Sequence, residues 1–135
     1  MKNLTFILVL SLFTFGAYAQ TSNYQLSSHI LDISKGAPAV GVTIQLKKLN
    51  VSTNKWIQID EKVTDQNGRV GSFLESSKNN EGIYKLTFLV SNYFKQKNTE
   101  SFYPFIDVVF EIKDSQHYHV PITLSEFGYA TYRGN

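Results

Sequence analysis

Residues 105–124 read FIDVVFEIKDSQHYHVPITL, and apolar side chains recur at every second position in two segments of this stretch. In residues 105–112 the apolar positions are Ile106, Val108, Phe110 and Ile112. In residues 116–124 they are Tyr118, Val120, Ile122 and Leu124. Because successive side chains of an extended strand point to opposite faces, this period predicts two strands that each cover a core with one face.

The same period appears upstream in residues 40–49, 55–63 and 83–90. The loop between the first two segments is short enough for a hairpin, and Asp65-Gln66-Asn67-Gly68 is a strong turn signal. The one helix that we predict covers residues 91–98, with Ser91 as its N-cap. Seven or eight short strands with one short helix predict an all-β fold, an antiparallel β-sandwich of two sheets.

Residues 1–19 have the pattern of a signal peptide. Lys2 supplies positive charge, residues 4–15 are apolar apart from Thr and Ser, and Ala17-Tyr18-Ala19 is a small-x-small cleavage site. The apolar run is shorter than the roughly 20 residues that span a bilayer, which disfavours an uncleaved anchor. We therefore expect cleavage after Ala19, export of the chain, and a single mature domain over residues 20–135.

The chain of 135 residues has a formal net charge of +2 and no cysteine. So small a charge gives neither nucleic acid nor an anionic membrane a broad basic face to bind, and we expect neither as a partner of the mature chain. An exported chain without cysteine has no disulfide, no thiolate nucleophile and no cysteine-ligated metal. Its stability must come from packing or from subunit association.

The alternation places His117 and His119 on the face of their strand that points away from the core. Either histidine alone is explained as an exposed or hydrogen-bonded structural residue. A metal pair is disfavoured, because a zinc site needs three or four ligands, and we predict no metal site. A strand-like segment continues into Tyr132-Arg133-Gly134-Asn135, and we expect this end to be packed, since unattached ends usually fray.

Three separated motifs carry a resemblance to a known family. They are Ser28-His29-Ile30-Leu31-Asp32 with Gly36-Ala37-Pro38-Ala39, Thr64-Asp65-Gln66-Asn67-Gly68-Arg69, and His117-Tyr118-His119-Val120-Pro121 followed by Tyr132-Arg133-Gly134. The residue types in these motifs, and the order of the motifs along the chain, resemble those of the 5-hydroxyisourate hydrolases, the enzymatic branch of the transthyretin family. The resemblance implies a transthyretin-like sandwich of about eight strands with one short helix, in agreement with the strand pattern.

The resemblance also implies a site. Its catalytic residues would be His29, Arg69 and His119, without a cofactor, and its substrate-binding residues would be Tyr132, Arg133, Gly134 and Asn135. The commonest family ending is Tyr-Arg-Gly-Ser, so Asn135 is a departure that we expect to tune the site. The family forms homotetramers, dimers of dimers, with each active site in the channel between the dimers. A role in purine catabolism favours the periplasm over secretion.

The implied reaction is hydrolysis of 5-hydroxyisourate, a planar urate oxidation product, to 2-oxo-4-hydroxy-4-carboxy-5-ureidoimidazoline. Attack of water on the ring carbonyl develops negative charge on oxygen, which the guanidinium of Arg69 or Arg133 would stabilise. A neutral imidazole would take the proton from the water. His29 and His119 are equal candidates for that general base.

Two other classes of function compete with the hydrolase. A transthyretin-like carrier would bind a small aromatic ligand in the same channel without hydrolysing it, but that branch lacks the two histidines and the terminal signature as a set. A structural or adhesive sandwich would be a monomer without a polar cluster. Arg69 alone, after a turn, is more often a solvated surface residue, so the catalytic prediction depends on all the motifs together.

Overall fold

The computed structural model describes residues 23–135. The predicted signal peptide, residues 1–19, and its cleavage site lie outside this range. Within the described residues no helix has the length and apolar character that crossing a membrane requires.

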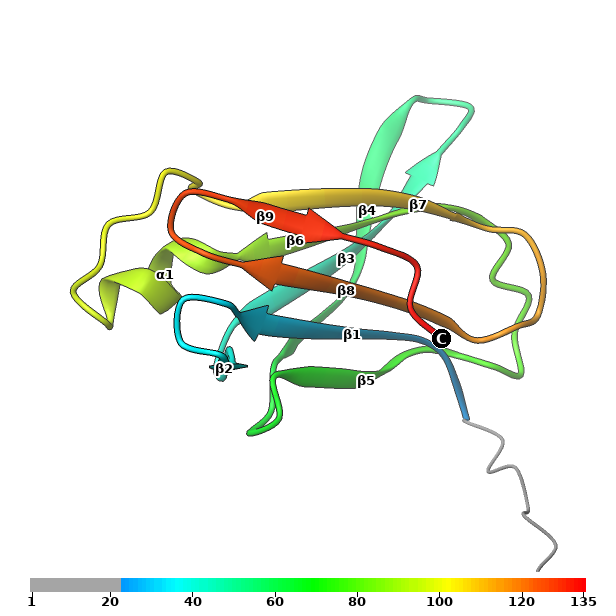
Figure 1. The fold of residues 1–135 in the computed structure, drawn as a ribbon. Helices are drawn as coiled ribbons and strands as arrows, with labels where there is room; N and C mark the ends of the chain where they lie inside the picture. The colour runs from blue at the N-terminus through cyan, green and yellow to red at the C-terminus, as the bar shows by residue number, and fades with distance from the viewer. Residues whose placement is uncertain (1–22) are drawn as a thin grey trace, which may run out of the picture.

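Two sheets pack face to face (Figure 1). The first, called the β1 sheet, contains β1 (Tyr24–Asp32), β2 (Ala37–Pro38), β5 (Arg69–Glu75), β8 (Tyr118–Leu124) and β9 (Tyr129–Thr131). The second, called the β3 sheet, has the order β4 (Lys55–Val63), β3 (Thr43–Asn50), β6 (Gly82–Leu89) and β7 (Ile106–Ile112). One short helix, α1 (Val90–Lys95), follows β6. The predicted all-β sandwich is confirmed.

One pair of neighbouring strands departs from the antiparallel pattern. β1 and β8 run parallel, with Ser27 beside His119 and His29 beside Pro121. β5 borders the other side of β1 and is antiparallel to it, as are the remaining neighbours in the sheets. The parallel pair therefore brings the beginning and the end of the described chain side by side.

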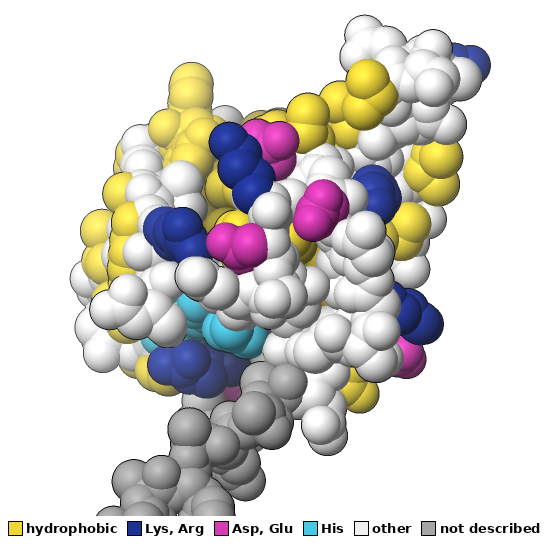
Figure 2. All heavy atoms as spheres, turned by 90° about the vertical axis from the view of Figure 1, so that its right-hand side faces the viewer, with side chains coloured by type: hydrophobic (Ala, Val, Ile, Leu, Met, Phe, Trp, Pro, Cys, Tyr) yellow, Lys and Arg dark blue, Asp and Glu magenta, His cyan; other side chains and the backbone are white. Residues whose placement is uncertain are grey.

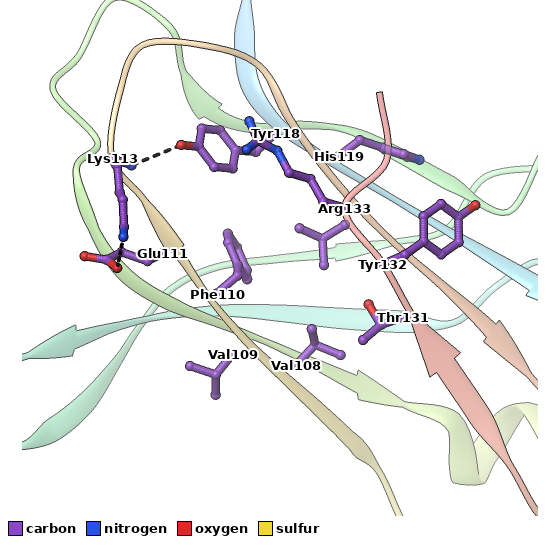
Figure 3. A pocket seen from close by; sticks show the side chains of 11 residues that line it. Val108, Val109, Phe110, Glu111, Lys113, Tyr118, His119, Thr131, Tyr132 and Arg133 are labelled. Atoms are coloured by element: carbon purple, nitrogen blue, oxygen red, sulfur yellow. Dashed lines mark hydrogen bonds and ion pairs between the residues drawn. The ribbon is translucent and has the colours of Figure 1, made fainter.

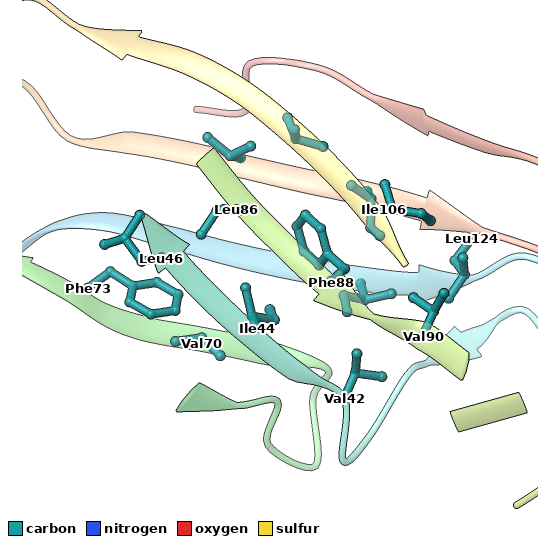
Figure 4. Packing of buried hydrophobic residues seen from close by; sticks show 14 of the residues in the cluster. Val42, Ile44, Leu46, Val70, Phe73, Leu86, Phe88, Val90, Ile106 and Leu124 are labelled. Atoms are coloured by element: carbon teal, nitrogen blue, oxygen red, sulfur yellow. The ribbon is translucent and has the colours of Figure 1, made fainter. Parts of the chain in front are cut away.

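The core lies between the two sheets (Figure 4). It is built from the inward residues of the alternating segments, and the fully buried ones include Ile30, Ile44, Leu46, Phe73, Leu86, Phe88 and Leu124. Burial of each such side chain stabilises the fold by roughly 1.5–3 kcal/mol relative to exposure. Every buried side-chain nitrogen and oxygen among residues 23–135 has a hydrogen-bond partner.

The predicted helix exists, but its predicted bounds were wrong. α1 spans Val90–Lys95 rather than residues 91–98, its N-cap position is Leu89, and no side chain caps it. Val90, Tyr93 and Phe94 are buried, so packing of this apolar face sets the start of the helix and overrides the capping preference of Ser91.

A buried carboxylate connects β1 to this helix. Asp32 is 1% exposed, and Oη of Tyr93 donates a hydrogen bond to its Oδ2 over 2.6 Å. The backbone N–H of Lys35 donates to Oδ1 over 3.3 Å. Burial, followed by the bond to Asp32, raises the pKa of Tyr93. The end of β1 is thus fixed to α1 by a paired polar contact.

Candidate functional site

The outward face of the β1 sheet brings together the three predicted catalytic residues. Along β1 the inward positions Leu26, Ser28 and Ile30 are fully buried, so His29 is on the opposite face. Arg69 on β5 is the cross-strand partner of His29, and His119 on β8 pairs with Ser27. Figure 2 shows the histidine side chains gathered beside lysine or arginine side chains on one face of the molecule.

The predicted turn at Asp65 places Arg69. Oδ1 of Asp65 accepts the backbone N–H groups of Asn67 and Arg69 over 2.8 and 2.9 Å. Gly68 has φ +69°, and its carbonyl accepts the N–H of Ile30 over 2.9 Å. A Cβ at Gly68 would lie only 2.7 Å from the Ile30 oxygen. This position therefore requires glycine, and the turn sets Arg69 opposite His29.

The end of the chain lies on the ring of His119. The N–H of Gly134 donates to the carbonyl of His119 over 2.9 Å, and the two residues form an antiparallel bridge. A Cβ at Gly134 would collide with Cδ2 of the imidazole and lie 3.1 Å from its Cγ. The close approach of this backbone to His119 therefore depends on glycine, and the predicted packing of the terminal segment is seen at this residue.

The side chain of Arg133 extends over the ring of Tyr118. Its Cζ lies 4.8 Å from the centroid of the Tyr118 ring, and Tyr118 is a buried residue of the core side of β8. Arg133 borders a cavity of about 440 Å³ that Phe110, Tyr118 and His119 also line (Figure 3). The side chains of Tyr132 and Asn135 are exposed. Of the four predicted substrate-binding residues, Gly134 is the one that packs on His119.

Ser27, which the sequence did not single out, and His117 complete the cluster as hydrogen-bond partners. Oγ of Ser27 lies 2.8 Å from Nδ1 of His119 and 2.8 Å from Nε2 of His117. Nδ1 of His117 lies 3.1 Å from the backbone oxygen of Tyr24. The alternation of β1 puts Ser27 on the same face as His29, but its pairing with His119 depends on the parallel register, which the sequence alone does not reveal.

Both histidines of the predicted catalytic set have lowered pKa values. Burial is the largest cause at each, and the charge of Arg69 is the second. For His29, a hydrogen bond to the Asn67 backbone and the charge of Asp65 act in the opposite direction on the pKa. For His119, His29 and His117 lower the pKa further, against a hydrogen bond to Ser27. A lowered pKa favours the neutral imidazole, which is the form that can accept a proton.

This arrangement suits water attack on a carbonyl. Neutral imidazoles supply a proton acceptor, and an exposed guanidinium on the adjacent strand supplies a fixed positive charge for an oxyanion. In the described part of the chain no group of three or more His, Cys, Asp or Glu side chains is placed to hold a metal ion.

Comparison with known proteins places the chain in a family. The sequence model of the HIUase/Transthyretin family matches residues 26–134. The chain belongs to the HIUase/Transthyretin family. The family match includes His29, Arg69, His119 and Gly134, and Asn135 follows it directly.

Similar proteins include some named 5-hydroxyisourate hydrolase and one named transthyretin. A probable 5-hydroxyisourate hydrolase of Caenorhabditis elegans is 46% identical over 111 residues, which cover 82% of this chain and 81% of that protein. The structure of Klebsiella pneumoniae 5-hydroxyisourate hydrolase is similar with a TM-score of 0.70 and 34% identity, over 82% of this chain and 98% of the other. The structure of sea bream transthyretin in complex with thyroxine is similar with a TM-score of 0.76 and 28% identity, over 82% of this chain and 94% of the other.

Proposed function

We propose that this protein hydrolyses 5-hydroxyisourate, acting as a cyclic amide hydrolase in urate degradation. The observation that carries the proposal is the meeting of His29, Arg69 and His119 on one sheet face, from three strands. The similarity to proteins named 5-hydroxyisourate hydrolase supplies the substrate. The product is 2-oxo-4-hydroxy-4-carboxy-5-ureidoimidazoline.

In the proposed mechanism the substrate lies over the outward face of β1 and β8. His119 or His29 takes a proton from water, and the resulting hydroxide adds to the ring carbonyl. The guanidinium of Arg69 stabilises the oxyanion before the ring carbon–nitrogen bond breaks. Removal of one such stabilising group costs about 10²–10³ in kcat in enzymes that use it. The reaction needs no cofactor.

The terminal residues complete the proposed substrate site. Gly134 holds the backbone against His119, and Tyr132 and Asn135 are exposed, so they are free to contact a planar, hydrogen-bonding ligand. Arg133 lies over the Tyr118 ring and lines the same cavity as His119. We therefore assign Arg133 to substrate binding and Arg69 to the oxyanion.

We propose that the protein acts as a homotetramer, a dimer of dimers, with the outward face of the β1 sheet between the dimers. β7 and β9 are edge strands of their sheets, and edge strands commonly pair across subunits. Val109 on β7 is 57% exposed, and Phe127, in the turn before β9, is 74% exposed. Both apolar side chains support burial at a subunit contact.

For the location of the protein we propose export and a periplasmic site of action. The support is the signal-peptide pattern of residues 1–19, with cleavage after Ala19. Mass determination of the protein recovered from a periplasmic extract would test this, and a chain that keeps residues 1–19 in the cytoplasmic fraction would contradict it.

The activity is tested with substrate generated in situ from urate. Native protein should accelerate the decay of 5-hydroxyisourate absorbance, and His119→Asn should lose most of that acceleration while remaining folded. The carrier alternative, suggested by the similarity to thyroxine-bound transthyretin, predicts binding of the substrate without faster decay. Unaccelerated decay with folded native tetramer would remove the hydrolase proposal.

A further inference from the structure

The hydroxyl of Ser27 lies between two imidazole rings, 2.8 Å from Nε2 of His117 and 2.8 Å from Nδ1 of His119. We propose that Ser27 and His117 are positioning residues that hold His119 in its Nδ1–H tautomer, so that Nε2 of His119 is the proton acceptor. This inference rests on the proposed hydrolase function and deepens it, because it names the nitrogen that accepts the proton.

The direction of each hydrogen bond follows from the carbonyl at one end of the network. The Tyr24 oxygen can only accept, so Nδ1 of His117, 3.1 Å away, carries a hydrogen. In a neutral ring the other nitrogen, Nε2 of His117, is then an acceptor, and it receives the single proton of the Ser27 hydroxyl. The Ser27 oxygen is left to accept from His119, so Nδ1 of His119 carries a hydrogen.

A neutral His119 with its hydrogen on Nδ1 has its lone pair on Nε2. Among residues 23–135 no hydrogen bond involves this nitrogen, whereas Nδ1 is held by Ser27. In the reaction, the proton of the attacking water moves to Nε2 as the water oxygen bonds to the carbonyl carbon. When the carbon–nitrogen bond breaks, that proton passes to the leaving nitrogen. The Ser27 oxygen accepts from Nδ1–H throughout and stabilises the transient imidazolium.

The backbone keeps this network in place. Ser27 and His119 are paired residues of the parallel strands β1 and β8, and His117 lies just before β8. The segment before His117 is fixed to β1 by Gln25, which is 3% exposed. Nε2 of Gln25 donates to the backbone oxygens of Asp114 and Gln116 over 2.6 and 3.1 Å. These partly buried bonds give the rigid support that a proton acceptor requires.

The test compares adjacent serines of β1. Ser27→Ala should lower kcat about 10- to 100-fold, with KM changed by less than about threefold. Ser27→Thr keeps a hydroxyl on a strand and should restore kcat to within about fivefold of the native value. The matched control is Ser28→Ala, because Oγ of Ser28 donates to the Val120 oxygen across the same strand pair but on the core side. It should lower Tm and leave kcat within about twofold of the native value.

The tautomer is read directly from the long-range ¹H–¹⁵N spectrum of the imidazole nitrogens, recorded on native protein without substrate. Hydrogens on Nδ1 of both His117 and His119 support the proposal, and loss of the fixed His119 tautomer in Ser27→Ala supports it further. A hydrogen on Nε2 of His119 in native protein overturns it, as does a Ser27→Ala protein with native kcat.

Failure of the proposed hydrolase function can be told apart from failure of the tautomer assignment. If native protein does not accelerate the decay of 5-hydroxyisourate, the assignment of Nε2 as proton acceptor falls with the function. The spectrum still decides whether Ser27 sets the tautomer of His119, because it requires no turnover.

Discussion

The two faces of strand β1 use polar groups in opposite ways. On the inward face, both oxygens of the Asp32 carboxylate accept hydrogen bonds, from Tyr93 and from the Lys35 backbone, and the residue is buried. On the outward face, His29 and the neighbouring His119 are only half-buried. Their lowered pKa values favour the neutral form, which can accept a proton. The buried face contributes stability, and the half-buried face is available for chemistry.

This contrast predicts that changes to the two faces separate activity from stability. The largest effect is expected for Arg69→Ala on the outward side. Removal of the guanidinium should lower kcat/KM about 10²- to 10³-fold, because the oxyanion loses its fixed positive charge. Tm should change little, since Arg69 is exposed. Decay of in-situ 5-hydroxyisourate gives the rate, and Lys55→Ala, an exposed cation of β4, is the control. Equal rates for Arg69→Ala and native protein would remove Arg69 from the site.

The converse effect is expected for Tyr93→Phe on the inward side. The substitution removes the donor to Oδ2 of Asp32 and leaves a buried carboxylate with one backbone partner, 3.3 Å away. An unsatisfied buried group costs about 1–3 kcal/mol, so Tm should fall by about 4–12 °C. The specific activity of the folded protein should stay native.

Tyr103→Phe is the matched control for that change, because the Tyr103 hydroxyl makes no hydrogen bond among residues 23–135 and its ring also packs against the core. Thermal unfolding followed by circular dichroism distinguishes the two variants. If both unfold at the native Tm, the Asp32–Tyr93 contact does not stabilise the fold.

A smaller loss of activity is expected for Gly134→Ala. The added Cβ would collide with the His119 ring, so either the chain end or the imidazole must move. Displacement of a catalytic group by a fraction of an ångström should lower kcat about 10-fold. Gly128→Ala is the control, since a Cβ there meets only Oγ of Ser125, at 3.7 Å. A Gly134→Ala protein as active as Gly128→Ala would show that the terminal backbone is not needed against His119.

Much of this contrast could be predicted from the sequence, and the part that could not has a physical reason. Period-two alternation located β3, β4, β6, β7 and β8 and put His119 on the outward face, and the Asp65 turn placed Arg69. It did not locate β1 and β5, the strands that carry His29 and Arg69. The bounds of α1 were not predictable, because burial of Tyr93 and Phe94 decided them. Ser27 was missed because its role depends on a parallel pairing with a strand 92 residues away. Arg133 matches its motif, but its position on the Tyr118 ring results from local packing.

The smallest effect concerns the response of the outward face to pH. Burial and Arg69 lower the pKa values of His29 and His119 from the ordinary value of 6.5, so both should titrate below pH 6.5. The acid limb of kcat/KM should lie there as well. Because the unfolded chain binds these protons more tightly, stability that is present above pH 6.5 should decline as the pH falls through the folded pKa values.

Arg69→Gln sharpens this prediction by removing a positive charge while keeping a polar side chain. The pKa values of both His29 and His119 should rise relative to the native protein, because Arg69 is the second cause of lowering at each. NMR titration of the imidazole C–H resonances measures them without requiring activity. Native pKa values at or above 6.5 would show that the outward histidines are solvated like ordinary surface residues. No rise in Arg69→Gln would show that the charge of Arg69 does not lower the two pKa values and that burial alone does.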